Sequence, residues 1–140
     1  MSETTTGHVA VGERIVHKTF PPITRQTLAL YCGASGDHNP IHVDIDFAKA
    51  AGFPDVFSHG MLVMAYLGQA LTDVIRPGNI RSFSTRFAAI TQLGARLTCE
   101  GHVTDLHEHM GEKRARIALT TKDENGEVKL AGEAVVAISP

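Results

Sequence analysis

The chain has 140 residues, of which 43% are hydrophobic, and a formal net charge of -2. This length predicts one domain over residues 1–140 whose core needs no disulfide or metal, and the nearly even charge argues against nucleic acid as a partner. The N-terminal residues do not resemble a secretory signal, and the longest apolar run is shorter than the ~20 residues of a bilayer span. We therefore expect a soluble cytoplasmic protein without a membrane partner, frayed over residues 1–7.

Two short helices are predicted in the first half of the chain. In the first helix Thr24 is the candidate N-cap and Gly33 the candidate stop. The second is predicted to begin with Asp46 as its cap and to end at Gly52. The stretch ASGDHNPIH between them is predicted to be a loop, because glycine, asparagine and proline favour turns.

A longer helix is predicted at about residues 60–76. Apolar residues occupy nearly its whole circumference from Met61 to Ile75, and a helix that is apolar all round is a buried helix. Arg76 suits the C-terminal end of a helix, whereas Pro77 and Gly78 do not continue it.

The second half of the chain alternates apolar and polar residues, which is typical of half-buried strands. Asn125-Gly126 is a strong hairpin signal, and His107 and His109 are interpreted as solvated residues of a connection between strands. The predicted strands cover residues 14–20, 81–89, 95–103, 113–121 and 127–138. The fold class is therefore α+β, with a sheet that curls around the long helix and an edge that a second copy of the chain can pair.

A polar cluster precedes the long helix. Asp37 and His42 lie five residues apart across a proline-stiffened turn, and both can approach one small molecule such as water. A carboxylate and an imidazole suit acid–base chemistry. The N–H groups near His59 and Gly60 at the start of the long helix can bind developing negative charge.

Three other interpretations of the cluster remain open at this point. Asp37 and Asn39 can simply form Asx turns while His42 packs against the next helix. A metal site could use Asp37, His38, His42 and His59, although no H-E-x-x-H motif is present. Nucleophilic catalysis has weaker support, since Cys32 lies on an apolar helix face and Ser35 and Ser58 lack a nucleophile-elbow context. No nucleotide-binding glycine pattern occurs, so we expect neither a cofactor nor a metal.

Together, SGDHNPIHVD and FSHGML before a long apolar helix resemble the MaoC-like family of (R)-specific enoyl-CoA hydratases and 3-hydroxyacyl-thioester dehydratases. The resemblance extends from about Ile15 to the C-terminus. It implies a hotdog fold, in which a curved antiparallel sheet wraps around one long helix, and a homodimer or higher homo-oligomer. It also implies reversible hydration of a trans-2-enoyl thioester, carried on CoA or an acyl carrier protein, to the (R)-3-hydroxyacyl thioester.

The resemblance also implies the roles of individual residues. Asp37 and His42 would hold the water, and the Gly60 N–H would polarise the thioester carbonyl. Some members carry a serine that assists the site where this chain has Gly68, so that hydroxyl is missing here. The small residues Ala65 and Gly68 would instead make room for a longer acyl group. The remaining candidates for substrate binding or support of the site are Asn39, Ser58, His59 and Met61.

Two alternative functions fit the same fold. A hotdog acyl-CoA thioesterase would direct water to the carbonyl carbon, which the pairing of His42 with Asp37 argues against. A subunit that only shapes the acyl tunnel of a heteromeric dehydratase would be expected to lack the aspartate or the histidine, and this chain retains both.

Overall fold

The structure, a computed structural model, describes residues 9–138, so the predicted fraying of residues 1–7 lies outside the described residues. Three α-helices come early in this part of the chain, α1 (Arg25–Ser35), α2 (Ile45–Ala50) and α3 (Gly60–Thr72). The strands are β1 (Arg14–Thr19), β2 (Ile80–Phe87), β3 (Thr98–His109), β4 (Glu112–Lys122) and β5 (Val128–Ala137).

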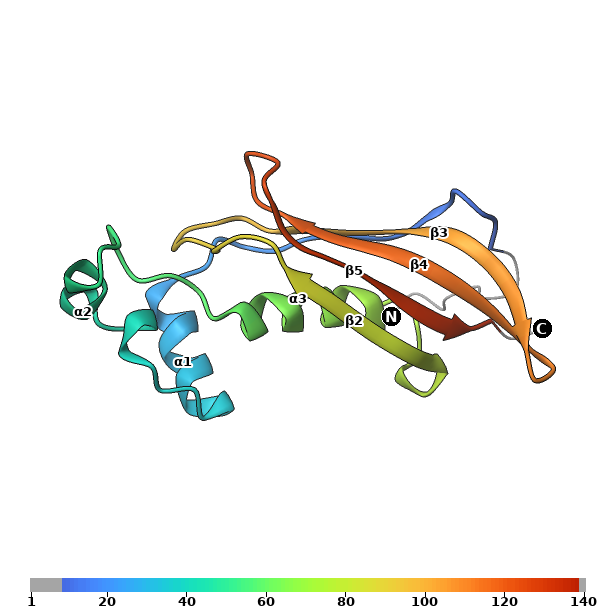
Figure 1. Ribbon diagram of the computed structural model, residues 1–140, viewed down its shortest axis with the longest axis horizontal. Coiled ribbons are helices and arrows are strands. Elements are labelled where there is room, and N and C mark those ends of the chain that lie inside the picture. The colour runs from blue at the N-terminus through green and yellow to red at the C-terminus, as the bar shows by residue number, and fades with distance from the viewer. Residues whose placement is uncertain (1–8, 139–140) are drawn as a thin grey trace.

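The five strands form one antiparallel sheet in the order β1-β3-β4-β5-β2. Figure 1 shows this sheet curving along α3, while α1 and α2 lie beyond one end of the sheet. The predicted α+β hotdog arrangement is confirmed. None of the helices in residues 9–138 has the length and apolar composition needed to cross a bilayer.

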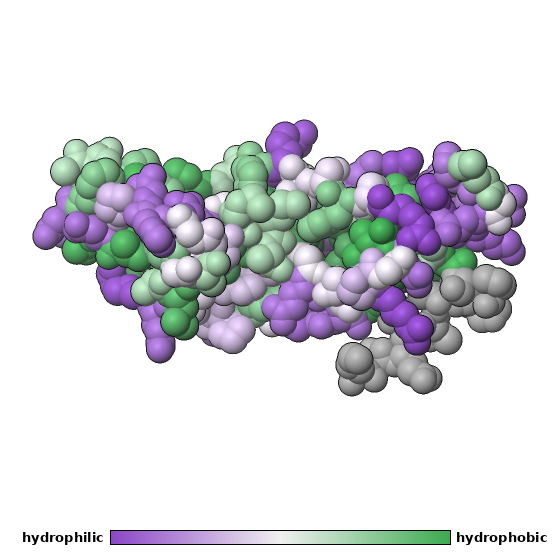
Figure 2. All heavy atoms as spheres, turned by 90° about the horizontal axis from the view of Figure 1, so that it is seen from below, coloured by the Kyte–Doolittle hydropathy of each residue, from purple (hydrophilic) through white to green (hydrophobic). Residues whose placement is uncertain are grey.

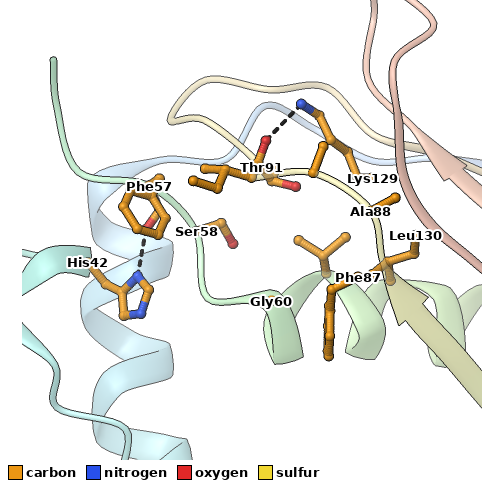
Figure 3. A pocket seen from close by; sticks show the side chains of 12 residues that line it. His42, Phe57, Ser58, Gly60, Phe87, Ala88, Thr91, Lys129 and Leu130 are labelled. Atoms are coloured by element: carbon orange, nitrogen blue, oxygen red, sulfur yellow. Dashed lines mark hydrogen bonds between the residues drawn. The ribbon is translucent and has the colours of Figure 1, made fainter. Parts of the chain in front are cut away.

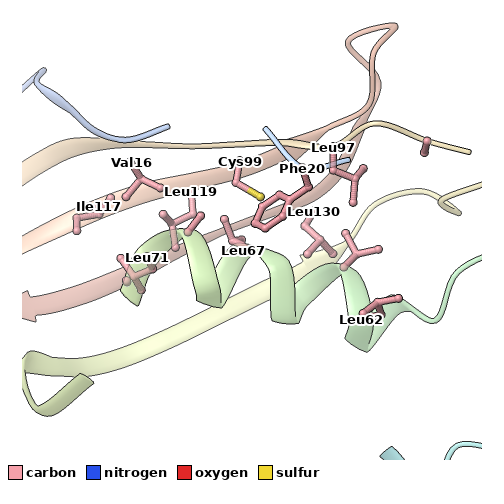
Figure 4. Packing of buried hydrophobic residues seen from close by; sticks show 14 of the residues in the cluster. Val16, Phe20, Leu62, Leu67, Leu71, Leu97, Cys99, Ile117, Leu119 and Leu130 are labelled. Atoms are coloured by element: carbon pink, nitrogen blue, oxygen red, sulfur yellow. The ribbon is translucent and has the colours of Figure 1, made fainter. Parts of the chain in front are cut away.

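The core lies between the sheet and one side of α3. Leu67 and Leu71 of the helix are fully buried, and the strands contribute Val16, Cys99 and Leu119, each at most 1% exposed. Figure 4 shows these side chains directed toward one another across the space between helix and sheet. Burial of apolar side chains at this interface stabilises the fold and holds the first turn of α3 in place.

The prediction that α3 is buried on all sides is wrong for the single chain. Met61 is 55% exposed, and Ala65 is also exposed. Residues four apart lie on the same face of a helix, so these two form one exposed stripe. The helix also ends at Thr72, earlier than predicted, although Ile75 beyond it is buried.

Two predicted helix boundaries are corrected. The first helix passes through Gly33 and ends at Gly36, which adopts a left-handed conformation (φ 77°) and donates its N–H to the Cys32 carbonyl. The N-cap of α2 is Asp44, not Asp46, because the Asp44 carboxylate accepts hydrogen bonds from two backbone N–H groups of the first turn.

The assignment of His107 and His109 to a loop is also wrong. Both belong to β3, where His107 pairs with Arg114 and His109 with Glu112 of β4. The turn is Met110-Gly111, with positive φ at both residues. The pairing extends the strands because it satisfies backbone groups that a loop would leave to water.

Gly132 of β5 pairs with Thr85 of β2 and lies close to the β2 backbone. A Cβ atom at this position would lie 2.0 Å from the Ser84 carbonyl oxygen and 2.7 Å from the Thr85 Cα. Both atoms belong to the backbone, so only separation of the strands would relieve the clash. Gly132→Ala is therefore expected to lower the free energy of unfolding by about 3 kcal/mol or more in a denaturant titration.

The matched control is Gly33→Ala inside α1, where an added Cβ meets nothing within 4 Å. This variant is expected to gain about 0.5–1 kcal/mol, since alanine is the better helix former. Equal denaturant midpoints of unfolding for Gly132→Ala and Gly33→Ala would contradict the close approach of β2 to β5.

Candidate active site

The loop between α1 and α2 is shaped by its own side chains. Asp37 Oδ1 accepts the N–H of Asn39 at 3.2 Å, and Asn39 Oδ1 accepts the N–H of Ile41 at 3.1 Å. A short 3₁₀ helix, Pro40–His42, follows. The turns that the sequence allowed are thus present, and they leave the second carboxylate oxygen of Asp37 available for other contacts.

His42 is held against the segment that leads into α3. Its Nδ1 lies 2.8 Å from the Phe57 carbonyl oxygen, and Figure 3 shows this bond at one end of the pocket. A carbonyl only accepts hydrogen bonds, so Nδ1 carries a proton, and in the neutral ring the lone pair is on Nε2. Nε2 lies 4.0 Å from Asp37 Oδ2, which is too long for a direct hydrogen bond and suits a water that contacts both atoms.

A cavity of about 330 Å³ opens beside this histidine. Asp37 is not among the residues that line it, and the Asp37 side chain beside His42 is 51% exposed. The Gly60 backbone forms part of the wall, and a Cβ there would lie 2.9 Å from the Phe87 ring. The lining includes His42, Ser58, Gly60, Val63, Phe87 and Leu130.

The imidazole ring of His59 packs against the ring of His42. The two rings stack with centroids 3.8 Å apart, and His59 Nε2 lies 3.3 Å from Cys32 Sγ. Burial, followed by the neighbouring charge of His42, lowers the pKa of His59. Burial and the Asp37 carboxylate raise the pKa of the Cys32 thiol, which disfavours the thiolate that nucleophilic catalysis would require.

Asp37, His42 and His59 could hold a metal ion by distance alone, since their ligand atoms lie within 4.8 Å of one another. However, the imidazole planes are nearly parallel, 29° apart. Lone pairs in the planes of stacked rings run side by side and do not converge on one ion. The geometry therefore favours acid–base chemistry over metal binding.

The other predicted site residues divide into two groups. Asn39 shapes the turn, and Ser58, which donates to the His59 carbonyl oxygen at 3.0 Å, lines the cavity. Met61, Ala65 and Gly68 do not line it; an added Cβ at Gly68 would lie 3.7 Å from Phe83. His38 is exposed beside the pair.

The sequence patterns missed two contributors to the site. The Phe57 carbonyl orients His42, and a backbone acceptor leaves no mark on residue type. Lys129 is 1% exposed in the cavity wall. In an alternating strand, a lysine between valine and leucine is expected to point to solvent. The sequence signal for a buried, paired lysine was the presence of Asp123 and Glu127 shortly before it.

The depressed pKa of His59 predicts a pH-dependent stability. Below about pH 6.5 the unfolded chain binds a proton at this position that the folded chain, with its lower pKa, does not yet bind. The free energy of unfolding should therefore fall as the pH is lowered from about 7 to about 5.5. Denaturant titrations of His59→Gln should show a smaller fall, whereas His38→Gln, at an exposed position, should keep the wild-type slope.

Comparisons with known proteins identify the family of this chain. The family model described as MaoC like domain matches residues 7–126. An (R)-specific enoyl-CoA hydratase from Rhodospirillum rubrum is 33% identical over 118 residues, which are 83% of this chain and 80% of that protein. The fatty acid synthase subunit beta of Aspergillus oryzae is 35% identical over 113 residues, 77% of this chain and only 5% of that much longer protein.

Among solved structures, the R-hydratase PhaJ1 from Pseudomonas aeruginosa in its unliganded form superposes with a TM-score of 0.83 and 29% identity. The match covers 99% of this chain and 86% of that chain. The similarity therefore includes the helices of the site as well as the sheet. This chain belongs to the MaoC-like domain family.

Proposed function

We propose that this protein is a hydro-lyase that reversibly adds water to a trans-2-enoyl thioester and forms the (R)-3-hydroxyacyl thioester. The observation that carries the proposal is the 4.0 Å gap between Asp37 Oδ2 and His42 Nε2, two atoms able to exchange a proton with water, with His42 in the wall of a cavity. The similarity to hydratases in sequence and structure supports it. The domain is proposed to span residues 1–140.

In the hydration direction, a water held between Asp37 and His42 attacks C3 of the enoyl group. The pair removes one proton from the water as the O–C3 bond forms, and the electrons of the double bond shift to give an enolate of the thioester. A proton returned from the pair to C2 completes the net addition of one water. Dehydration follows the same steps in reverse.

The thioester carbonyl is proposed to lie at the N-terminus of α3. The first N–H groups of a helix have no partner within the helix, and the helix dipole places positive potential there. The Gly60 N–H is the proposed donor to the enolate oxygen, a contribution of about 3 kcal/mol for a single donor of this type. Because Gly60 lacks a side chain, the Phe87 ring can pack against this first turn of the helix.

We further propose a homodimer, with the carrier being CoA or an acyl carrier protein. The exposed stripe of α3 and the edge strand β2 offer an apolar surface that includes Met61 and Phe87, which are 55% and 53% exposed. Figure 2 shows hydrophobic residues across the middle of the face viewed from below. Met61, Ala65 and Gly68 would contribute to an acyl tunnel only in such a dimer. The buried thiols of Cys32 and Cys99 suit a cytoplasmic location.

The test is an absorbance assay of the conjugated double bond with crotonyl-CoA and longer trans-2-enoyl-CoA substrates. Loss of the double bond, with formation of a product that an (R)-specific 3-hydroxyacyl-CoA dehydrogenase oxidises, is expected. Release of free thiol without loss of the double bond would instead favour the thioesterase. Enoyl groups on acyl carrier protein, assayed in parallel, identify the carrier.

A further inference from the structure

Lys129 is a buried cation with three hydrogen bonds, one of them to Ile90 in the cavity wall. Its Nζ donates to the Ile90 carbonyl oxygen at 2.8 Å, to Gln92 Oε1 at 3.1 Å and to the Glu127 carboxylate. Three donors thus meet three acceptors. A buried charge is costly unless it is paired and hydrogen-bonded, so removal of this group would leave several acceptors unsatisfied.

Asp123 extends the same set of contacts. Its Oδ2 lies 3.5 Å from Lys129 Nζ and accepts the Gln92 side-chain N–H at 3.2 Å. Burial by itself would raise the pKa of Asp123, but hydrogen bonds from Glu127, Gln92 and Asn125 and the charge of Lys129 outweigh it and lower the pKa. The carboxylate therefore stays ionised beside the ammonium. We call Lys129, Asp123, Gln92 and Glu127 the Lys129 network.

The Lys129 network is connected to the catalytic segment through the backbone. Gln92 forms an isolated β-bridge with Phe57, and the Ser58 N–H donates to the Thr91 carbonyl oxygen at 2.8 Å. The Phe57 carbonyl in turn accepts from His42 Nδ1. Figure 3 shows Lys129 reaching from its strand toward Thr91, on the side of the pocket opposite His42.

We propose that Lys129 is a positioning residue for the hydration: by clamping residues 90–92 it fixes the Phe57 carbonyl, and with it the orientation and protonated nitrogen of His42. The inference rests on the proposed function for its catalytic consequence, but the state of His42 can be measured without any activity. Misplacement of a reacting group by a distant change can cost up to about 100-fold in rate.

The test combines two substitutions with two measurements. Lys129→Met removes the charge and keeps the length of the side chain, whereas Gln92→Ala removes the clamp at a surface residue and leaves the Lys129–Asp123 ion pair in place. Imidazole ¹⁵N shifts should report the Nδ1–H form of His42 in the wild type and a mixture of forms in both variants. We expect kcat to fall about 10-fold or more, with a smaller change in KM.

Thr121→Val is the matched control, because Thr121 is a fully buried polar residue whose hydroxyl contacts Cys99 and lies outside the Lys129 network. It should keep the wild-type kcat and the wild-type His42 signal. The inference is overturned if both network variants fold and retain the Nδ1–H form, or if Thr121→Val changes His42 to the same extent. If Lys129→Met does not fold, Gln92→Ala decides. A wild type without hydratase activity defeats the proposed function, whereas the ¹⁵N result still decides the positioning role.

Discussion

Asp37→Asn is expected to lower kcat for enoyl-CoA hydration by about 1,000-fold, the scale of general acid–base catalysis. An asparagine amide does not take a proton from water, but its oxygen can still accept the Asn39 N–H that shapes the turn. The fold should therefore be preserved while the chemistry is lost. Initial rates of loss of the double bond, together with thermal unfolding of the variant, measure the two effects separately.

Asp46→Asn is the control for this substitution. It makes the same chemical change at an exposed carboxylate in the first turn of α2. Its rate should stay close to that of the wild type. An Asp37→Asn variant with a rate within tenfold of the wild type would show that the carboxylate does not exchange the proton.

His42→Ala should have an effect of similar size, about 100- to 10,000-fold on kcat. The substitution removes the lone pair on Nε2 and leaves the Phe57 carbonyl without its donor. The side chain is 10% exposed, so some loss of stability is also expected, and the rate must be compared at a temperature where both proteins are folded.

His38→Ala provides the contrast, because this exposed histidine belongs to the same loop but has no place in the proposed mechanism. Near-normal activity of His38→Ala together with loss of activity in His42→Ala would support the assignment. Equal losses in the two variants would point instead to a general disturbance of the loop.

The interpretation of Asp37 as an Asx-turn residue and its interpretation as a catalytic carboxylate are compatible. Asp37 uses Oδ1 for an Asx turn and directs Oδ2 toward His42. A carboxylate has two oxygens with several lone pairs, so one role does not exclude the other. This explains why residue types alone left both interpretations open.

Hydrophobic periodicity predicted that the strands and the central helix exist, but it predicted the residues at which elements begin and end less well. The end of α1 at Gly36 depends on a left-handed backbone conformation, and Gly33 was an equally suitable residue type. The extension of β3 to His109 depends on pairing with β4, which comes later in the chain. Boundaries set by partners far along the chain are not encoded in a local pattern.

The sequence by itself determined the α+β class, the central helix and the candidates Asp37, His42 and Gly60, because periodicity and turn residues act over a few neighbouring positions. Only the tertiary structure decided which nitrogen of His42 carries the proton, which side of α3 is exposed and that Lys129 lies buried in the cavity wall. These features depend on contacts between residues far apart in the chain: His42 and Phe57 are 15 positions apart, and Ile90 and Lys129 are 39 apart. Both contacts use a backbone carbonyl, a group that is chemically alike at every position.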